Sequence, residues 1–175
     1  MKEQPAAPAQ GRPLLRMGPA YEVGTAAAGV FLAVAALMLL PGLGHALMQV
    51  QLWQAAAVVA ALAAGHELAH AGAYRLLGGR RLRFGVNRLW GVLPVTAWCE
   101  LGEPLSRPSF LAVLAAPQIA VMGTAALLPI PLPLAALLIW LNLAGGGGDL
   151  VLAFAVLASR ARVIQDGPEG AVALR

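Results

Sequence analysis

Long apolar stretches, separated by shorter polar ones, make up most of the chain from residue 23 onward. Each stretch is long enough to cross a bilayer hydrocarbon core of about 30 Å. The sequence therefore predicts an all-α integral membrane protein with four transmembrane helices. The predicted spans cover about residues 23–40, 52–77, 109–128 and 134–158.

The first apolar stretch, from Val23 to Leu40, has a second interpretation. A cleaved signal peptide also contains an apolar run, and Gly44-His45-Ala46 would then be its cleavage site. Because this run is longer than a typical signal-peptide core, we favour a retained first span.

Residues 81–101 do not continue the helical pattern. They carry many β-branched and aromatic residues, show no 3.6-residue period and contain Gly91 near their centre. This pattern predicts a short β-hairpin between the second and third spans, with Pro94 restricting its second strand to an edge. An irregular interfacial loop anchored by Trp90 and Trp98 fits the same residues. The sequence leaves both interpretations open.

The polar ends of the chain complete a three-part organisation. Residues 1–21 are predicted to be a flexible cytosolic tail, residues 22–159 a four-span membrane domain, and residues 160–175 a cytosolic C-terminal tail. The 12 Lys and Arg residues lie in the two tails or around the loop between the second and third spans. The loops 41–51 and 129–133 contain none of them. By the positive-inside rule, both termini face the cytosol.

Composition supports a membrane location and excludes several kinds of site. Hydrophobic residues make up 59% of the chain and charged residues only 11%, whereas a soluble domain has about 25% charged residues. The single cysteine, Cys99, excludes an intramolecular disulfide and a cysteine-based metal cluster. The basic residues are not interleaved with aromatic ones in a patch, so we expect no nucleic-acid partner. The sequence does not indicate an oligomeric state.

The second predicted span contains His66-Glu67-Leu68-Ala69-His70, an H-E-x-x-H pattern. Residues four apart on a helix project from one face, so His66 and His70 can bind one metal ion. Glu67 lies beside them, where it can accept a proton from a metal-bound water. Imidazole and carboxylate ligands favour Zn²⁺. Buried histidines that only form hydrogen bonds are the alternative interpretation.

Zinc also needs a third protein ligand, and Asp149 is the candidate. The second and fourth spans run in the same direction, and at about 1.5 Å per residue His66, His70 and Asp149 lie roughly 21, 27 and 25 Å from the outer face. The Gly145–Gly148 run before Asp149 weakens the helix and would let the carboxylate approach the metal. Alternatively, the glycines form a packing surface and Asp149 caps the second half of a broken helix.

Asn142 is a further polar residue in the fourth span. It could donate a hydrogen bond to the carbonyl or oxyanion of a substrate. A hydrogen bond between helices is the more common use of such a residue.

Together these residues carry a resemblance. The H-E-x-x-H helix, Ala116-Pro117 in the third span, and Asn142 followed by Asp149 after a Gly-rich stretch resemble the zincin metallopeptidase family of small bacterial membrane proteins. The resemblance covers most of residues 50–165 and implies that the two histidines and Asp149 bind zinc, with Glu67 as general base, in a bacterial plasma membrane. The chain is more distantly similar to site-2 intramembrane metalloproteases. It departs from their pattern, which has prolines between the Asn and the Asp and a glycine after the Asp, where this chain has Leu150.

The sequence thus predicts a membrane-embedded zinc-dependent metallopeptidase that hydrolyses peptide bonds of membrane-associated peptides or proteins near the cytosolic face. The hairpin of residues 81–101 could bind such a substrate as an added strand. A catalytically silent membrane adaptor or regulator, with a structural or absent metal, is the alternative. A small transporter is a third possibility that we rank last, because no second polar path is visible in the spans.

Overall fold

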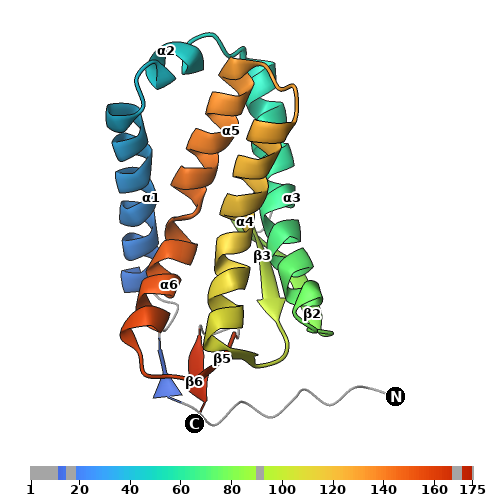
Figure 1. Ribbon diagram of the computed structural model, residues 1–175. Coiled ribbons are helices and arrows are strands. Elements are labelled where there is room, and N and C mark those ends of the chain that lie inside the picture. Colours follow the sequence, from blue (N-terminus) through green and yellow to red (C-terminus); the bar gives the residue numbers. More distant parts are fainter. Residues whose placement is uncertain (1–11, 15–18, 90–92, 167–170, 175) are drawn as a thin grey trace.

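The computed structural model describes residues 12–14, 19–89, 93–166 and 171–174. Its long helices lie side by side, and its strands gather at one end of the bundle (Figure 1). The helices are α1 (Pro19–Leu39), α2 (Leu43–Leu47), α3 (Leu52–Leu76), α4 (Arg107–Leu127), α5 (Leu132–Gly145) and α6 (Gly147–Ala158).

The predicted spans correspond to α1, α3, α4 and the α5–α6 pair. The first three are long and apolar enough to cross a membrane, and α5 and α6 together count as a fourth candidate if the pair, bent by 47°, is one span. Large apolar side chains on these helices remain exposed, among them Phe31 at 70%, Met38 at 80% and Leu127 at 84%. Such exposure on helices is typical of lipid-facing surfaces.

The predicted β-hairpin is present. Strand β2 (Leu82–Leu89) pairs antiparallel with β3 (Leu93–Leu101), and β3 packs against α3. Pro94 lies in β3, which pairs only with β2 within the described residues and is therefore an edge strand, as predicted. Trp90 and Gly91 lie outside the described residues, and so does the side chain of Trp98.

The register of the hairpin fixes which groups of β3 face away from β2. Gly102 donates its N–H to the carbonyl of Arg81 at 2.9 Å, which makes this a hydrogen-bonded pair. Because hydrogen-bonded and non-hydrogen-bonded pairs alternate in an antiparallel ladder, the N–H groups of Cys99 and Leu101 point outward. The N–H of Leu101 indeed donates to Oδ2 of Asp166 at 3.4 Å. The outward edge of β3, defined here by Cys99 and Leu101, therefore faces other parts of the protein.

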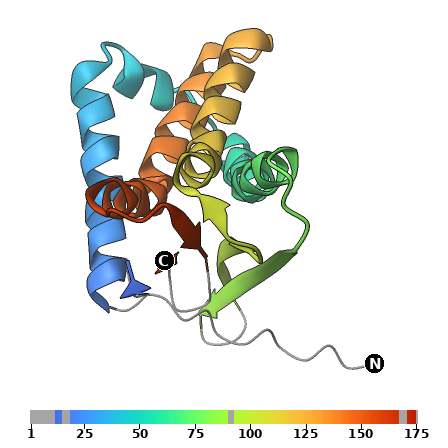
Figure 2. The ribbon, with the colours of Figure 1, turned by 60° about the horizontal axis from the view of Figure 1, so that its bottom comes forward.

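A second, four-stranded sheet lies at the same end of the bundle (Figure 2). Its strands run in the order β1 (Arg12–Pro13), β6 (Val172–Leu174), β5 (Val163–Gln165) and β4 (Leu105–Ser106). Strand β1 falls in the predicted flexible N-terminal tail, and β5 and β6 fall in the predicted C-terminal tail. They are held by burial, because Ile164 in β5 is fully buried in the core that contains Tyr74 and Phe110. A strand of two or three residues is too short to show a period in the sequence.

The glycine run between α5 and α6 packs closely against α1. A Cβ atom on Gly147 would lie 2.3 Å from the carbonyl oxygen of Thr25 in α1, and a Cβ on Gly29 would lie 2.2 Å from that of Ala144. Side chains at these two positions would push the helices apart, so glycine is required for this packing. Gly146 follows α5 as its C-cap, and α6 begins at Gly147. The break places Asp149 in the first turn of α6.

Candidate metal centre

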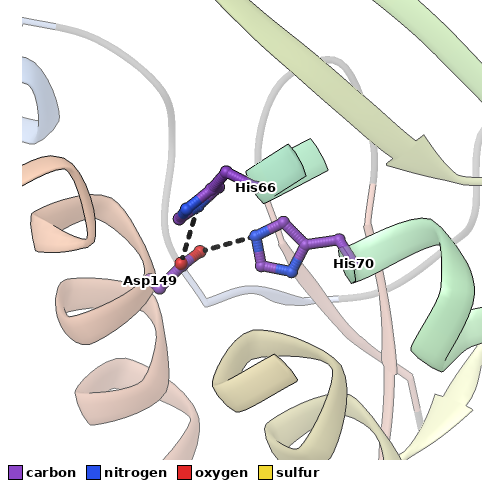
Figure 3. A group of neighbouring side chains, drawn as sticks. All are labelled: His66, His70 and Asp149. Carbon is purple, nitrogen blue, oxygen red and sulfur yellow. Dashed lines mark ion pairs between the residues drawn. The ribbon is translucent and has the colours of Figure 1, made fainter. Parts of the chain in front are cut away.

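Helix α3 presents His66 and His70 on the face that is turned towards α6. One helical turn separates them, and their ring centroids lie 4.9 Å apart. Both side chains point towards Asp149 (Figure 3). Nε2 of His66 lies 3.2 Å from Oδ2 of Asp149, and Nε2 of His70 lies 3.3 Å from Oδ1. The structure thus brings together the three residues that the sequence selects as metal ligands.

His70 is oriented by the backbone of α4. The residue is 8% exposed, and its Nδ1 lies 2.8 Å from the carbonyl oxygen of Val113. A carbonyl oxygen only accepts hydrogen bonds, so Nδ1 of His70 carries a proton. In the neutral ring, Nε2 then has a free lone pair directed at Asp149.

His66 is oriented by Asn142 of α5. Nδ1 of His66 lies 3.3 Å from Oδ1 of Asn142. The Nδ2 group of Asn142 donates to Oε1 of Gln118 at 2.5 Å, and the whole residue is only 2% exposed. Both polar ends of the amide therefore have protein partners. Asn142 is buried between helices and contacts His66, which corresponds to the second interpretation of this residue, a hydrogen bond between helices.

The three side chains fit a divalent metal ion. Their ligand atoms all lie within 4.8 Å of one another. Around zinc, with bonds of about 2.1 Å, neighbouring tetrahedral ligands are about 3.4 Å apart, close to the 3.2 and 3.3 Å found between the imidazoles and the carboxylate. Oδ2 of Asp149 is buried and has no hydrogen-bond donor. Imidazole lone pairs facing carboxylate oxygens are favourable when a cation lies among them.

Glu67 is not part of this three-residue cluster but lies next to it on α3, half-buried. Its carboxylate lies close to the backbone N–H of Cys99 on the outward edge of β3. Burial, followed by the negative charges of Glu67 and Asp166, raises the pKa of the Cys99 thiol to about 11. The hairpin thus reaches the residue that the sequence predicts as the general base.

Three groups at this site were not predicted from the sequence: Gln118, the carbonyl of Val113 and the backbone N–H of Cys99. A signal existed only for Gln118, which is the one amide side chain in an otherwise apolar stretch of α4. The other two are backbone groups, whose position depends on the tertiary structure and not on the identity of their own residues.

Comparison with known proteins gives a family. A search of curated proteins and a search of solved structures found no match. The sequence model of one family matches residues 56–164, which include every residue of the metal cluster and Glu67. Since that match covers more than half of the chain, this protein belongs to the family described as "Putative zincin peptidase".

Proposed function

We propose that this chain is a membrane-embedded, zinc-dependent peptidase that hydrolyses membrane-associated peptides or proteins, with Glu67 as the general base. Its family membership supports a hydrolytic function. The observation that carries the proposal is the convergence of His66, His70 and Asp149, with the Nε2 atoms of both imidazoles aimed at one carboxylate.

In this proposal the two histidines and Asp149 would hold the zinc ion. A bound zinc ion acidifies water and polarises a carbonyl group. Glu67 accepts a proton from the water that attacks the scissile carbonyl, and it then delivers the proton to the leaving amine as the C–N bond breaks. The carboxyl group is therefore restored to its ionised state at the end of each turnover.

We propose that the substrate binds along the outward edge of β3. A peptide bond inside a helix is shielded by its own hydrogen bonds, so the substrate must be extended at the site. The outward N–H of Cys99 lies at Glu67, and that of Leu101 donates to Asp166. An extended peptide that pairs with this edge would replace these contacts and pass the predicted base. Cys99→Pro removes that N–H and keeps the ladder with β2. It should reduce hydrolysis and leave zinc content unchanged, whereas Cys99→Ala should behave like the wild type.

We further propose that the strand-bearing end of the bundle faces the cytosol of a bacterial cell. The Lys and Arg residues of the two tails and the arginines around the hairpin favour that orientation. His66 and His70 lie in the half of α3 that leads into β2. The site would then lie within the membrane near its cytosolic face, where membrane-associated substrates can reach it.

The experiment uses the full chain in liposomes together with a reporter peptide anchored by an apolar helix. Wild-type protein should contain zinc at an equimolar ratio and cleave the reporter. Glu67→Gln should retain zinc and cleave at least about 100-fold more slowly. His66→Ala and Asp149→Ala should lose the zinc. Leu68→Ala is the control on the same helix, because Leu68 is 62% exposed and should affect neither property.

Two results contradict the proposal. Cleavage by Glu67→Gln at the wild-type rate would exclude the general-base role. An intact reporter in the presence of zinc-loaded wild-type protein would favour the catalytically silent adaptor.

A further inference from the structure

Helix α4 supplies no residue of the metal cluster, yet it contacts the orienting groups of both histidines. Val113 and Gln118, one on each side of Pro117, are the contact points. The two contacts are independent, because one uses a backbone carbonyl and the other a side-chain amide. Each can therefore be tested separately.

The contact with His70 depends on a missing N–H group. In a regular α-helix the carbonyl of Val113 accepts a hydrogen bond from the N–H of residue 117. Residue 117 is proline, which has no N–H. The carbonyl of Val113 therefore has no partner within the helix, and it accepts a hydrogen bond from Nδ1 of His70 at 2.8 Å.

The contact with His66 runs through two amides. Nε2 of Gln118 lies 3.5 Å from the backbone carbonyl of Asn142, which can only accept. Oε1 of Gln118 is thereby turned towards Nδ2 of Asn142, and Oδ1 of Asn142 towards His66. Each amide orientation follows from the previous one, and the last acceptor requires the proton of His66 to be on Nδ1.

Gly146 is part of the same arrangement. A Cβ atom at this position would lie 2.3 Å from Nε2 of Gln118. Only glycine therefore leaves room for the amide of Gln118 to reach across from α4 to the break between α5 and α6. This gives Gly146 a role distinct from that of Gly147, which admits α1.

We propose that Pro117 and Gln118 are positioning residues that keep the protons of His70 and His66 on Nδ1, and so hold both Nε2 atoms ready for a metal ion. The inference rests on the proposed metal centre. Groups that orient ligating histidines typically contribute 10- to 100-fold to metal affinity. The effect of losing either positioning residue should be of that size.

Pro117→Ala distinguishes a role of Pro117 in orienting His70 from a role in the stability of the fold. The substitution restores an N–H that competes with His70 for the carbonyl of Val113. It also removes a proline from the interior of a helix, which by itself favours the helix. A residue of purely structural importance would lower the melting temperature when replaced. A positioning residue at 117 predicts weaker metal binding without a lower melting temperature.

Gln118 is tested by a pair of variants. Gln118→Met keeps the length of the side chain but cannot orient Asn142. The side-chain amide of Asn142 is then free to turn its Nδ2 towards His66. Gln118→Glu still accepts from Nδ2 of Asn142, but its second carboxyl oxygen has no proton to donate to the carbonyl of Asn142, so it should restore the orientation only in part. Ile119→Ala is the control on the same helix, because Ile119 is 69% exposed.

The measurement is Zn²⁺ affinity of the full chain in detergent, by competition with a chromophoric chelator, with the Co²⁺ absorption spectrum as a report on ligand geometry. Pro117→Ala and Gln118→Met should each bind Zn²⁺ about 10- to 100-fold more weakly. Gln118→Glu should bind Zn²⁺ more tightly than Gln118→Met, and Ile119→Ala should stay close to wild type. Wild-type affinity in both Pro117→Ala and Gln118→Met overturns the inference, and wild-type affinity in one of them overturns the role of that residue. If the wild type itself binds no Zn²⁺, the proposed metal centre fails and this inference with it.

Discussion

His70 on α3 and Asp149 on α6 face each other, with Nε2 of the imidazole 3.3 Å from Oδ1 of the carboxylate. Apart from this close approach, α3 packs mainly against α4, α5 and β3. The two side chains therefore mark where α6, the second half of the last predicted span, meets the helix of the H-E-x-x-H pattern. A cation that binds between them should act as a cross-link between these elements.

Zinc should therefore stabilise the folded chain. A ligand that binds only the folded state contributes about 2.7 kcal/mol at a free concentration 100 times its Kd. We expect the melting temperature in detergent to rise with Zn²⁺ and to fall when a chelator removes it. Asp149→Ala is the control and should show little response to either. An equal rise in that variant would place the zinc elsewhere on the protein.

The glycines before Asp149 should differ in their tolerance of a side chain. A Cβ at Gly147 would meet the backbone of Thr25 at 2.3 Å, whereas a Cβ at Gly145 would meet nothing within 4 Å. Gly147→Ala should lower the free energy of unfolding by roughly 1–3 kcal/mol, because backbone atoms of α1 must shift. Gly145→Ala should be neutral or stabilise by up to about 1 kcal/mol. Thermal unfolding in the same detergent compares them, and equal effects would contradict the close approach of α1.

The parts of the site that follow from local geometry could be predicted from the sequence. His66 and His70 share a helix face because of their spacing, and the position of Asp149 level with them follows from the rise of a helix. The break in the last predicted span follows from the glycine run. In each case, residues near one another in the chain determine the result.

The parts that depend on contacts between distant segments could not be predicted. The sequence left the use of Asn142 open between a substrate and another helix, because nothing in it shows that Gln118 of α4 comes to lie beside Asn142. The strands in the predicted tails escaped detection for the same reason. Ile164 is buried by residues of α3 and α4, and its own three-residue strand carries too little pattern to reveal that.

The melting temperature should depend on pH in the acid range because of Glu103, which lies in the loop that follows β3. Glu103 accepts hydrogen bonds from the N–H of Arg80 at 2.6 Å and from the hydroxyl of Tyr74 at 2.8 Å, and these lower the pKa of its carboxyl group from the ordinary value of 4.5. The stabilisation is present above the unfolded-state pKa, and it is lost as the pH falls through the folded-state pKa. As the pH falls from above the unfolded-state pKa of Glu103 to below its folded-state pKa, the melting temperature should fall more steeply for the wild type than for Glu103→Gln. Parallel curves would show that the carboxylate has no such role.

The contact between Glu67 and β3 can be tested through the single cysteine, independently of any catalytic activity. Burial raises the pKa of the Cys99 thiol to about 11, with further contributions from the charges of Glu67 and Asp166. Since the thiolate is the reactive form, alkylation by iodoacetamide at pH 8 should be slow in the folded protein. Glu67→Gln removes one negative charge beside the thiol, which lowers its pKa and should speed alkylation several-fold.

Leu68→Ala is the matched control for this experiment, because Leu68 neighbours Glu67 on α3 but is 62% exposed and carries no charge. It should leave the alkylation rate unchanged. The dependence on pH identifies the cause: a lower pKa shifts the whole rate profile to lower pH, whereas greater exposure of the thiol raises the rate and leaves the profile in place. A rate in Glu67→Gln equal to that of the wild type would mean that the predicted general base does not lie against the outward edge of β3. The strand-addition route for substrate would then lose its support.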